Sequence, residues 1–199
     1  MGYDIAPEET DKTRAHELML RQQPQKGLEG VKKDYKAMIS LLYVGRMLDV
    51  PPEQNAIPVI QRLRNSGKYA LYIVTSRSSS SENPEIQATG KWLEHYSLRF
   101  DAVISAGDHN KREALKSLSP LLFVDDSASK LYEIFEDPEV CTRPPSGLEN
   151  TYFGLFRQKS NRHVEPRGLI GTIDGWLELE SKVYELTNRR LTPSSANIR

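Results

Sequence analysis

Apolar and polar residues follow two different periods along the chain, which predict helices in some segments and buried strands in others. Apolar side chains recur at three- and four-residue steps through residues 31–47, the spacing of an amphipathic helix. Residues 38–44 (MISLLYV) are continuously apolar and also fit a buried strand; we favour the helix because the wider period continues past both ends. The same reasoning predicts further helices at residues 13–21, 56–65, 85–96, 111–118, 127–135 and 173–190.

Short apolar segments between these helices predict β-strands. They carry no helical period and are rich in aromatic and β-branched residues, as is typical of strands covered on both faces. The segments are residues 69–74 (YALYIV), 101–105 (DAVIS), 121–124 (LLFV) and 151–156 (TYFGLF). Because strands and helices alternate at short intervals, the pattern predicts an α/β fold with a doubly wound parallel sheet.

The distribution of prolines and polar residues divides the chain into three expected segments. Residues 1–50 are expected to form a helical, cap-like N-terminal segment, which ends where Pro51 and Pro52 stop the long helix. Residues 51–190 hold all the predicted strands and form the α/β domain. Residues 191–199 (LTPSSANIR) are expected to be a disordered tail.

Composition excludes several classes of protein. With 199 residues, 38% of them hydrophobic and 27% charged, the chain can bury a core. Its 27 basic and 27 acidic side chains balance, so we expect neither a nucleic-acid partner nor an anionic membrane. Cys141 is the single cysteine, which excludes an intramolecular disulfide and suits a reducing compartment. No apolar segment reaches the roughly 20 residues of a membrane span, so we expect a soluble, cytoplasmic protein of unspecified oligomeric state.

Polar residues follow three of the predicted strands at the point where each strand ends. Thr75 and Ser76 follow the first, Lys111 begins the helix after the second, and Asp125 and Asp126 follow the third. Ligands of parallel α/β sheets bind beyond the carboxyl ends of the strands, so we expect these side chains to share one edge. The basic segment 156–167 is read instead as a solvated loop.

These residue types suit phosphate chemistry. Hydroxyls and backbone N–H groups at a helix start bind phosphoryl oxygens, and a lysine neutralises their charge. Two adjacent carboxylates suit Mg²⁺, which takes one or two carboxylates and keeps several waters. Each also has an ordinary structural reading: Thr75 in a turn or helix cap, Lys111 as a solvated helix residue, and residues 125–127 as caps of the next helix.

The order Thr75, Lys111, Asp125–Asp126 resembles the haloacid dehalogenase-like (HAD) phosphohydrolase superfamily. That family has a hydroxyl motif after one strand, a lysine at a helix start and paired aspartates after a later strand. The segments YIVTSR, Thr89-x-x-Trp92-Leu93 and FVDDS look more narrowly like its deoxyribonucleotidase-type branch. The resemblance covers about residues 50–135 and implies a HAD-type doubly wound domain.

The resemblance also implies an activity and roles for the site residues. It implies a Mg²⁺-dependent phosphatase acting on a small phosphorylated metabolite or nucleotide. Thr75, together with Ser76, would hold the phosphate, and Lys111 would stabilise the phosphorylated nucleophile. Asp125 would help to bind Mg²⁺, and Asp126 would be a second ligand or an orienting residue.

The chain departs from the family at the catalytic nucleophile. The family's nucleophile lies in a DxD motif after the first strand, which is central in the sheet between the strands carrying the Thr and Asp-Asp motifs. Residues 1–74 contain no DxD motif. Either residues 38–44 replace that strand, or the chain begins downstream of it, or the sheet is rearranged.

The missing motif leaves a second function open, a catalytically inactive HAD-fold binding or regulatory module. A receiver-like signalling domain also combines acidic residues, a hydroxyl and a lysine. Its acidic pair comes first in the chain, however, whereas here the hydroxyl of Thr75 comes first and the acidic pair last.

Overall fold

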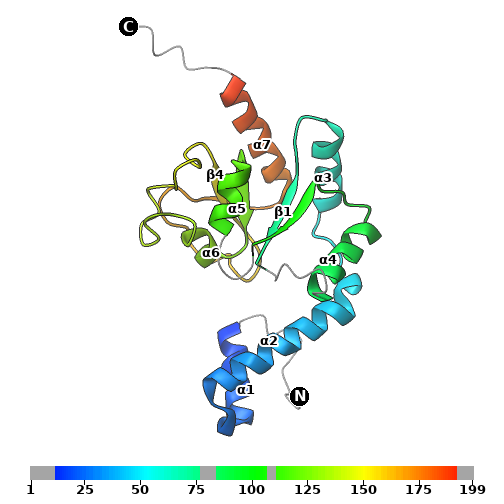
Figure 1. Ribbon diagram of the computed structural model, residues 1–199, viewed down its shortest axis with the longest axis vertical. Helices are drawn as coiled ribbons and strands as arrows, with labels where there is room; N and C mark the ends of the chain where they lie inside the picture. The colour runs from blue at the N-terminus through cyan, green and yellow to red at the C-terminus, as the bar shows by residue number, and fades with distance from the viewer. Residues whose placement is uncertain (1–11, 77–83, 107–110, 192–199) are drawn as a thin grey trace. The chain divides into compact units, whose positions relative to one another are not determined.

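The computed structural model describes residues 12–76, 84–106 and 111–191, which form helices and parallel strands (Figure 1). The α-helices are α1 (Lys12–Gln22), α2 (Gly27–Arg46), α3 (Ala56–Asn65), α4 (Pro84–His95), α5 (Lys111–Leu118), α6 (Ala128–Tyr132) and α7 (Trp176–Leu191). Short 3₁₀ helices are η1 (Pro24–Lys26) and η2 (Met47–Asp49). The strands are β1 (Tyr72–Thr75), β2 (Ala102–Ser105), β3 (Leu122–Asp125), β4 (Tyr152–Phe156) and β5 (Gly171–Ile173). The predicted α/β class is confirmed.

Most elements lie where the sequence places them, and the differences have local causes. Residues 38–44 lie inside α2, so the helical interpretation is confirmed and the strand alternative is wrong. β1 begins at Tyr72 rather than at residue 69, and α6 ends at Tyr132 rather than at residue 135. The helix predicted from residue 173 begins at Trp176, because residue 173 is the last residue of β5. The carbonyl of residue 173 accepts a hydrogen bond from the N–H of Arg157 at 2.8 Å.

The strands belong to two hydrogen-bonded sheets rather than to one. β1 and β2 pair in parallel, with Thr75 opposite Ser105. The other sheet has the order β3-β4-β5, also parallel, with Asp125 opposite Leu155. Within the described part of the chain, no strand ladder joins β1 to β3. The predicted parallel strands are therefore present, but they do not form a single continuous sheet.

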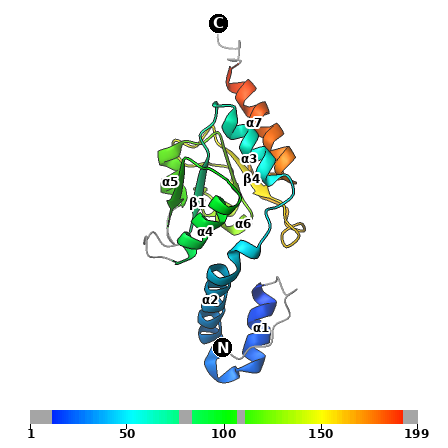
Figure 2. The ribbon, with the colours of Figure 1, turned by 90° about the vertical axis from the view of Figure 1, so that its right-hand side faces the viewer.

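The chain divides into two compact units. The smaller unit comprises Met1–Pro51 and Ser80–Tyr96, and the larger unit comprises Pro52–Ser79 and Ser97–Arg199. In the smaller unit, α1 packs against α2, as Figure 2 shows, and α4 also packs on α2. The indole N–H of Trp92 in α4 donates to the carbonyl of Val50 at 2.8 Å. The expected N-terminal helical segment therefore shares its unit with α4, which the sequence assigned to the α/β domain.

The sheet β3-β4-β5 of the larger unit is covered on both faces. Successive side chains of a strand point to opposite faces, and those of β4 divide accordingly between two clusters. Phe153 and Leu155 pack with side chains of α5 and α6, the loop residue Leu148 and other buried residues. Phe156 and Tyr152 pack with side chains of α3 and α7. The carboxyl ends of β3 and β4 are thus held in a two-sided core.

Several expectations fall on residues outside the described ranges. The expected tail 191–199 is among them, apart from Leu191, which ends α7. Residues 1–11 of the expected N-terminal segment also lie outside, as do residues 77–83 and 107–110 of the expected α/β domain. Across the ranges that the structure does describe, none of the helices combines the length and the apolar character needed to cross a membrane.

Candidate functional site

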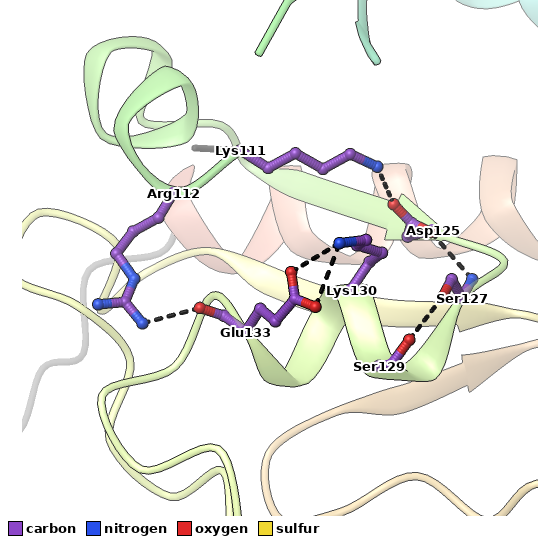
Figure 3. A network of polar contacts seen from close by, with 7 residues as sticks. All are labelled: Lys111, Arg112, Asp125, Ser127, Ser129, Lys130 and Glu133. Carbon is purple, nitrogen blue, oxygen red and sulfur yellow. Dashed lines mark hydrogen bonds and ion pairs between the residues drawn. The ribbon is translucent and has the colours of Figure 1, made fainter. Parts of the chain in front are cut away.

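Lys111 and Asp125 form an ion pair in which both side chains are largely buried. Lys111 is the first residue of α5 and Asp125 the last of β3, and the lysine Nζ donates to the aspartate Oδ2 (Figure 3). The two side chains are only 15% and 7% exposed. Nζ also lies 5.9 Å from the centre of the Phe123 ring. Lys111 is therefore not a solvated helix residue: its charge is held against the carboxyl end of β3.

The second oxygen of Asp125 organises the turn that follows the strand. Oδ1 accepts the backbone N–H of Ser127 at 2.9 Å, and the Ser127 hydroxyl lies 3.0 Å from that of Ser129 (Figure 3). Ser127 directly precedes α6. α6 has no side-chain cap hydrogen bond, so the bond from Ser127 to Asp125 closes the turn before the helix rather than capping it. One oxygen of Asp125 is held by this turn and the other by Lys111, so that both oxygens fix the carboxylate.

Asp126 stands next to this pair and is harder to ionise than an ordinary aspartate. The surrounding protein partly desolvates its carboxyl group, and the negative charge of Asp125 lies beside it; both effects raise the pKa of Asp126. Asp126 nevertheless belongs to the exposed residues, so solvent and solutes reach it. A bound cation stabilises two adjacent carboxylates, because its positive charge offsets their negative charges.

Thr75 and Ser76 lie at the end of the other sheet. Thr75 is the last residue of β1, and its carbonyl accepts the N–H of Ala106 at 2.8 Å. Both residues are half-buried. The structure thus brings Lys111 and Asp125 into contact, places Asp126 beside them, and puts the two hydroxyl residues on a strand that shares no ladder with β3.

Asn161 is a residue of this site that the sequence interpretation missed. It lies in the segment read as a solvated loop, yet it is only 8% exposed. Its Nδ2 donates to the carbonyl of Asp126 at 2.7 Å and to that of Phe156 at 2.8 Å. A useful signal was its position, five residues beyond the end of β4, at the same strand edge as the candidate residues.

The remainder of that loop is tied to itself as well as to β4. Arg157 is 11% exposed in its side chain, donates to the carbonyl of Arg162 and pairs with Glu165 at 3.2 Å. The N–H of Gln158 donates to Oδ1 of Asn161 at 2.7 Å. The basic segment is therefore a built structure around Asn161 rather than a solvated loop at every residue.

The donor set of Asp125 and Asp126 fits Mg²⁺ in part. Carboxylate oxygens are its preferred protein ligands, and one or two of them are enough when water and substrate phosphate complete the shell. Among the residues the structure describes, no group of three or more His, Cys, Asp or Glu side chains is placed to hold a metal. This small oxygen set is unlike a structural zinc centre or a calcium cage of protein ligands.

Comparisons with known proteins add no family assignment. Neither protein-family models, nor curated protein sequences, nor solved structures give a match to this chain.

Proposed function

We propose that the larger unit is a HAD-like, doubly wound phosphohydrolase domain that binds a small phosphorylated metabolite or nucleotide with Mg²⁺. The observation that carries the proposal is the buried contact of Lys111 with Asp125, two residues 14 positions apart, one at the start of α5 and the other at the end of β3. An ordinary surface ion pair would contribute little and would leave both groups in water. Here a lysine and a carboxylate are held at the strand edge where ligands of such folds bind.

Lys111 is suited to contact a phosphoryl group. Its ammonium has three N–H donors, and the bond to Asp125 uses one of them. Because its side chain is only 15% exposed, water screens its charge less than that of a surface lysine. We assign to Lys111 the neutralisation of phosphoryl charge, and to Thr75 and Ser76 the hydrogen bonds to phosphoryl oxygens.

Asp125 and Asp126 are the residues to which we assign Mg²⁺. When bound, the ion supplies positive charge to the phosphoryl oxygens. The adjacency of the two residues supports this role, because a divalent cation offsets the negative charge of two neighbouring carboxylates.

A binding module without turnover is the second candidate function. It is favoured because, among the described residues, no strand ladder joins β1 to β3. In the HAD family, the strand that carries the nucleophile lies between the strands that correspond to these two. Residues 1–74 also contain no DxD motif. Aspartyl-phosphate chemistry needs an attacking carboxylate and a general acid. Loss of a nucleophile costs on the order of 10⁴- to 10⁶-fold in kcat by analogy with triad knockouts, so we expect slow turnover. We also expect weak Mg²⁺ binding, because the absent motif would have supplied a further carboxylate.

The variant Asp125→Asn tests the site. We expect Mg²⁺-dependent hydrolysis of p-nitrophenyl phosphate by the unmodified chain to be slow, and the variant to lose at least about 10-fold of it, as is usual for one missing electrostatic group. Glu180→Gln is the matched control. Glu180, on α7, is a carboxylate of similar burial to Asp125, and it forms an ion pair at 2.6 Å with Arg62 on α3. Thermal shifts with Mg²⁺ and inorganic phosphate measure binding separately from turnover.

The outcomes separate the two candidates. Hydrolysis that Asp125→Asn loses and Glu180→Gln keeps supports the phosphohydrolase. Binding of Mg²⁺ and phosphate without turnover above background supports the binding module. Equal hydrolysis in the unmodified chain and in Asp125→Asn removes Asp125 from the site, and absence of all binding contradicts both candidates.

A further inference from the structure

The side chain of Asn161 joins two strand ends and a loop through three hydrogen bonds. Its two N–H donors reach the carbonyls of Asp126 and Phe156, at 2.7 and 2.8 Å. Its Oδ1 accepts the N–H of Gln158 at 2.7 Å. A carboxamide has two donors and one accepting oxygen, so this environment uses every group that the side chain offers. An aspartate or an alanine at the same position could not reproduce these contacts.

The contact with Asp126 lies just beyond the last pair of the β3–β4 ladder. That ladder ends at Asp125 opposite Leu155. The residue after β3 is Asp126, and the last residue of β4 is Phe156; the amide of Asn161 donates to both of their carbonyls. Asn161 therefore continues the connection between the two strands by one residue, through a side chain instead of the backbone.

We propose that Asn161 is the positioning residue that sets the geometry of the Asp125–Asp126 pair for cation binding. Its amide holds the carbonyl of Asp126, which belongs to the Asp126–Ser127 peptide group, and the N–H of that same group donates to Oδ1 of Asp125 at 2.9 Å. A fixed peptide group there limits the directions in which both carboxylates can point. The inference rests on the proposed function of Asp125 and Asp126. Residues that orient ligands in this way commonly change metal affinity by about 10- to 100-fold when removed.

The opposite end of the same two strands offers a matched control. The hydroxyl of Thr151, just before β4, donates to the carbonyl of Pro120, just before β3, at 2.8 Å. It is a side-chain bond to a backbone carbonyl across the same strand pair, at the amino end. Thr151→Val removes that bond with little change of shape, so it perturbs the strand pair without touching the carboxylates.

The experiment compares Asn161→Ala, Asn161→Asp and Thr151→Val in the full chain. Calorimetric titration with Mg²⁺ alone measures cation affinity, and amide hydrogen exchange of Ser127 measures the order of the turn independently of any ligand. We expect both Asn161 variants to weaken Mg²⁺ binding at least about 10-fold and to speed Ser127 exchange. Thr151→Val should leave both within about 2-fold, a change smaller than the expected ligand-orienting effect.

Each outcome decides a separate point. Unchanged Ser127 exchange and unchanged Mg²⁺ affinity in the Asn161 variants overturn the inference, as does an equal effect of Thr151→Val. If the unmodified chain binds no Mg²⁺, the proposed function fails, while Ser127 exchange still decides whether Asn161 holds the turn. If the variants do not fold, exchange of the Asn161 side-chain amide in the unmodified chain decides: slow exchange supports its two donated bonds, to Asp126 and Phe156, and rapid exchange contradicts them.

Discussion

The two parallel sheets of the larger unit differ in how well their strands are buried. In β4, Phe153 and Leu155 are 2% and 0% exposed. In the two-stranded sheet, Tyr72 of β1 and Val103 of β2 are 42% and 41% exposed. Parallel strands are stable when both faces are covered and partners lie on both sides, conditions that β4 meets and a pair of strands does not. We therefore expect β3-β4-β5 to form the stable part of the unit and β1-β2 to open more readily.

The candidate site is divided between these two sheets. Asp125 and Asp126 end a strand of the buried sheet, whereas Thr75 ends a strand of the more exposed one. Lys111 follows the exposed sheet in the chain, and its side chain contacts the buried one. Lys111 and Asp125 are thus held in place by their hydrogen bonds, whereas the proposed binding of phosphate at the hydroxyls would have to bear the cost of ordering β1 and β2.

The largest expected difference between the sheets is in the cost of removing an apolar side chain. Leu155→Ala leaves a cavity in a fully buried cluster and should lower the free energy of unfolding by about 2–5 kcal/mol. Val103→Ala removes a side chain that is 41% exposed and should cost less than about 1 kcal/mol. Urea denaturation with both variants measures the two values, and similar losses would show that burial does not distinguish the sheets.

A glycine beside the buried sheet should give the next largest effect. Gly168 has a φ of +55°, and a Cβ there would lie 2.2 Å from the carbonyl oxygen of Val140 and 2.3 Å from that of Cys141. Gly168→Ala should therefore cost about 1–3 kcal/mol for the backbone conformation and more for the contact. The N–H of Leu169 donates to the Cys141 carbonyl at 2.9 Å, so the backbone cannot move away without breaking that bond.

Gly147 separates the two causes of that cost. Its φ is +87°, but a Cβ there would meet nothing within 4 Å. Gly147→Ala should show only the conformational penalty, about 1–3 kcal/mol. Denaturation of both variants gives the comparison. If the two glycine variants lose equal stability, the close approach of Gly168 to the Val140 carbonyl contributes nothing.

The sequence predicted correctly those features of the fold that are determined by residues close together in the chain. The periodic apolar positions of α2 specified a helix, and the rule that polar residues follow strands brought Lys111 and Asp125 together correctly. β5 was missed because Gly171–Ile173 is too short to show a period and is defined by its pairing with β4. The division of the strands into two sheets also depends on pairing between strands that are distant in the chain. No local sequence pattern indicates this pairing. Asn161 was missed because a polar residue in a basic loop looks the same whether its amide is buried or solvated.

The smallest expected effect concerns the amino end of the exposed sheet, where Asp101 links β1 to β2. Its Oδ2 accepts a hydrogen bond from the N–H of Leu71 at 2.7 Å and forms an ion pair with Arg64. Its own N–H donates to the Leu71 carbonyl at 2.7 Å. The bond from Arg64, followed by that from Leu71, holds the pKa of Asp101 below its ordinary value. Asp101 therefore stabilises the folded state above its unfolded pKa of about 3.9, and this contribution is lost as the pH falls through the lower, folded pKa.

Asp101→Asn should consequently loosen the exposed sheet and leave the buried one unchanged. We expect faster amide hydrogen exchange in β1 and β2, no change in β4, and a difference from the unmodified chain that shrinks once the pH falls below about 3.9. Asp137→Asn is the control, because Asp137 lies beside the buried sheet and also has a lowered pKa. Its carboxylate accepts hydrogen bonds from the backbone N–H groups of Thr142 and Arg143 at 3.0–3.1 Å. If Asp101→Asn speeds exchange in β4 as much as in β1, the two sheets open together. The difference in burial between the sheets would then produce no difference in their stability. The hydroxyls at the end of β1 would be as well ordered as the carboxylate at the end of β3.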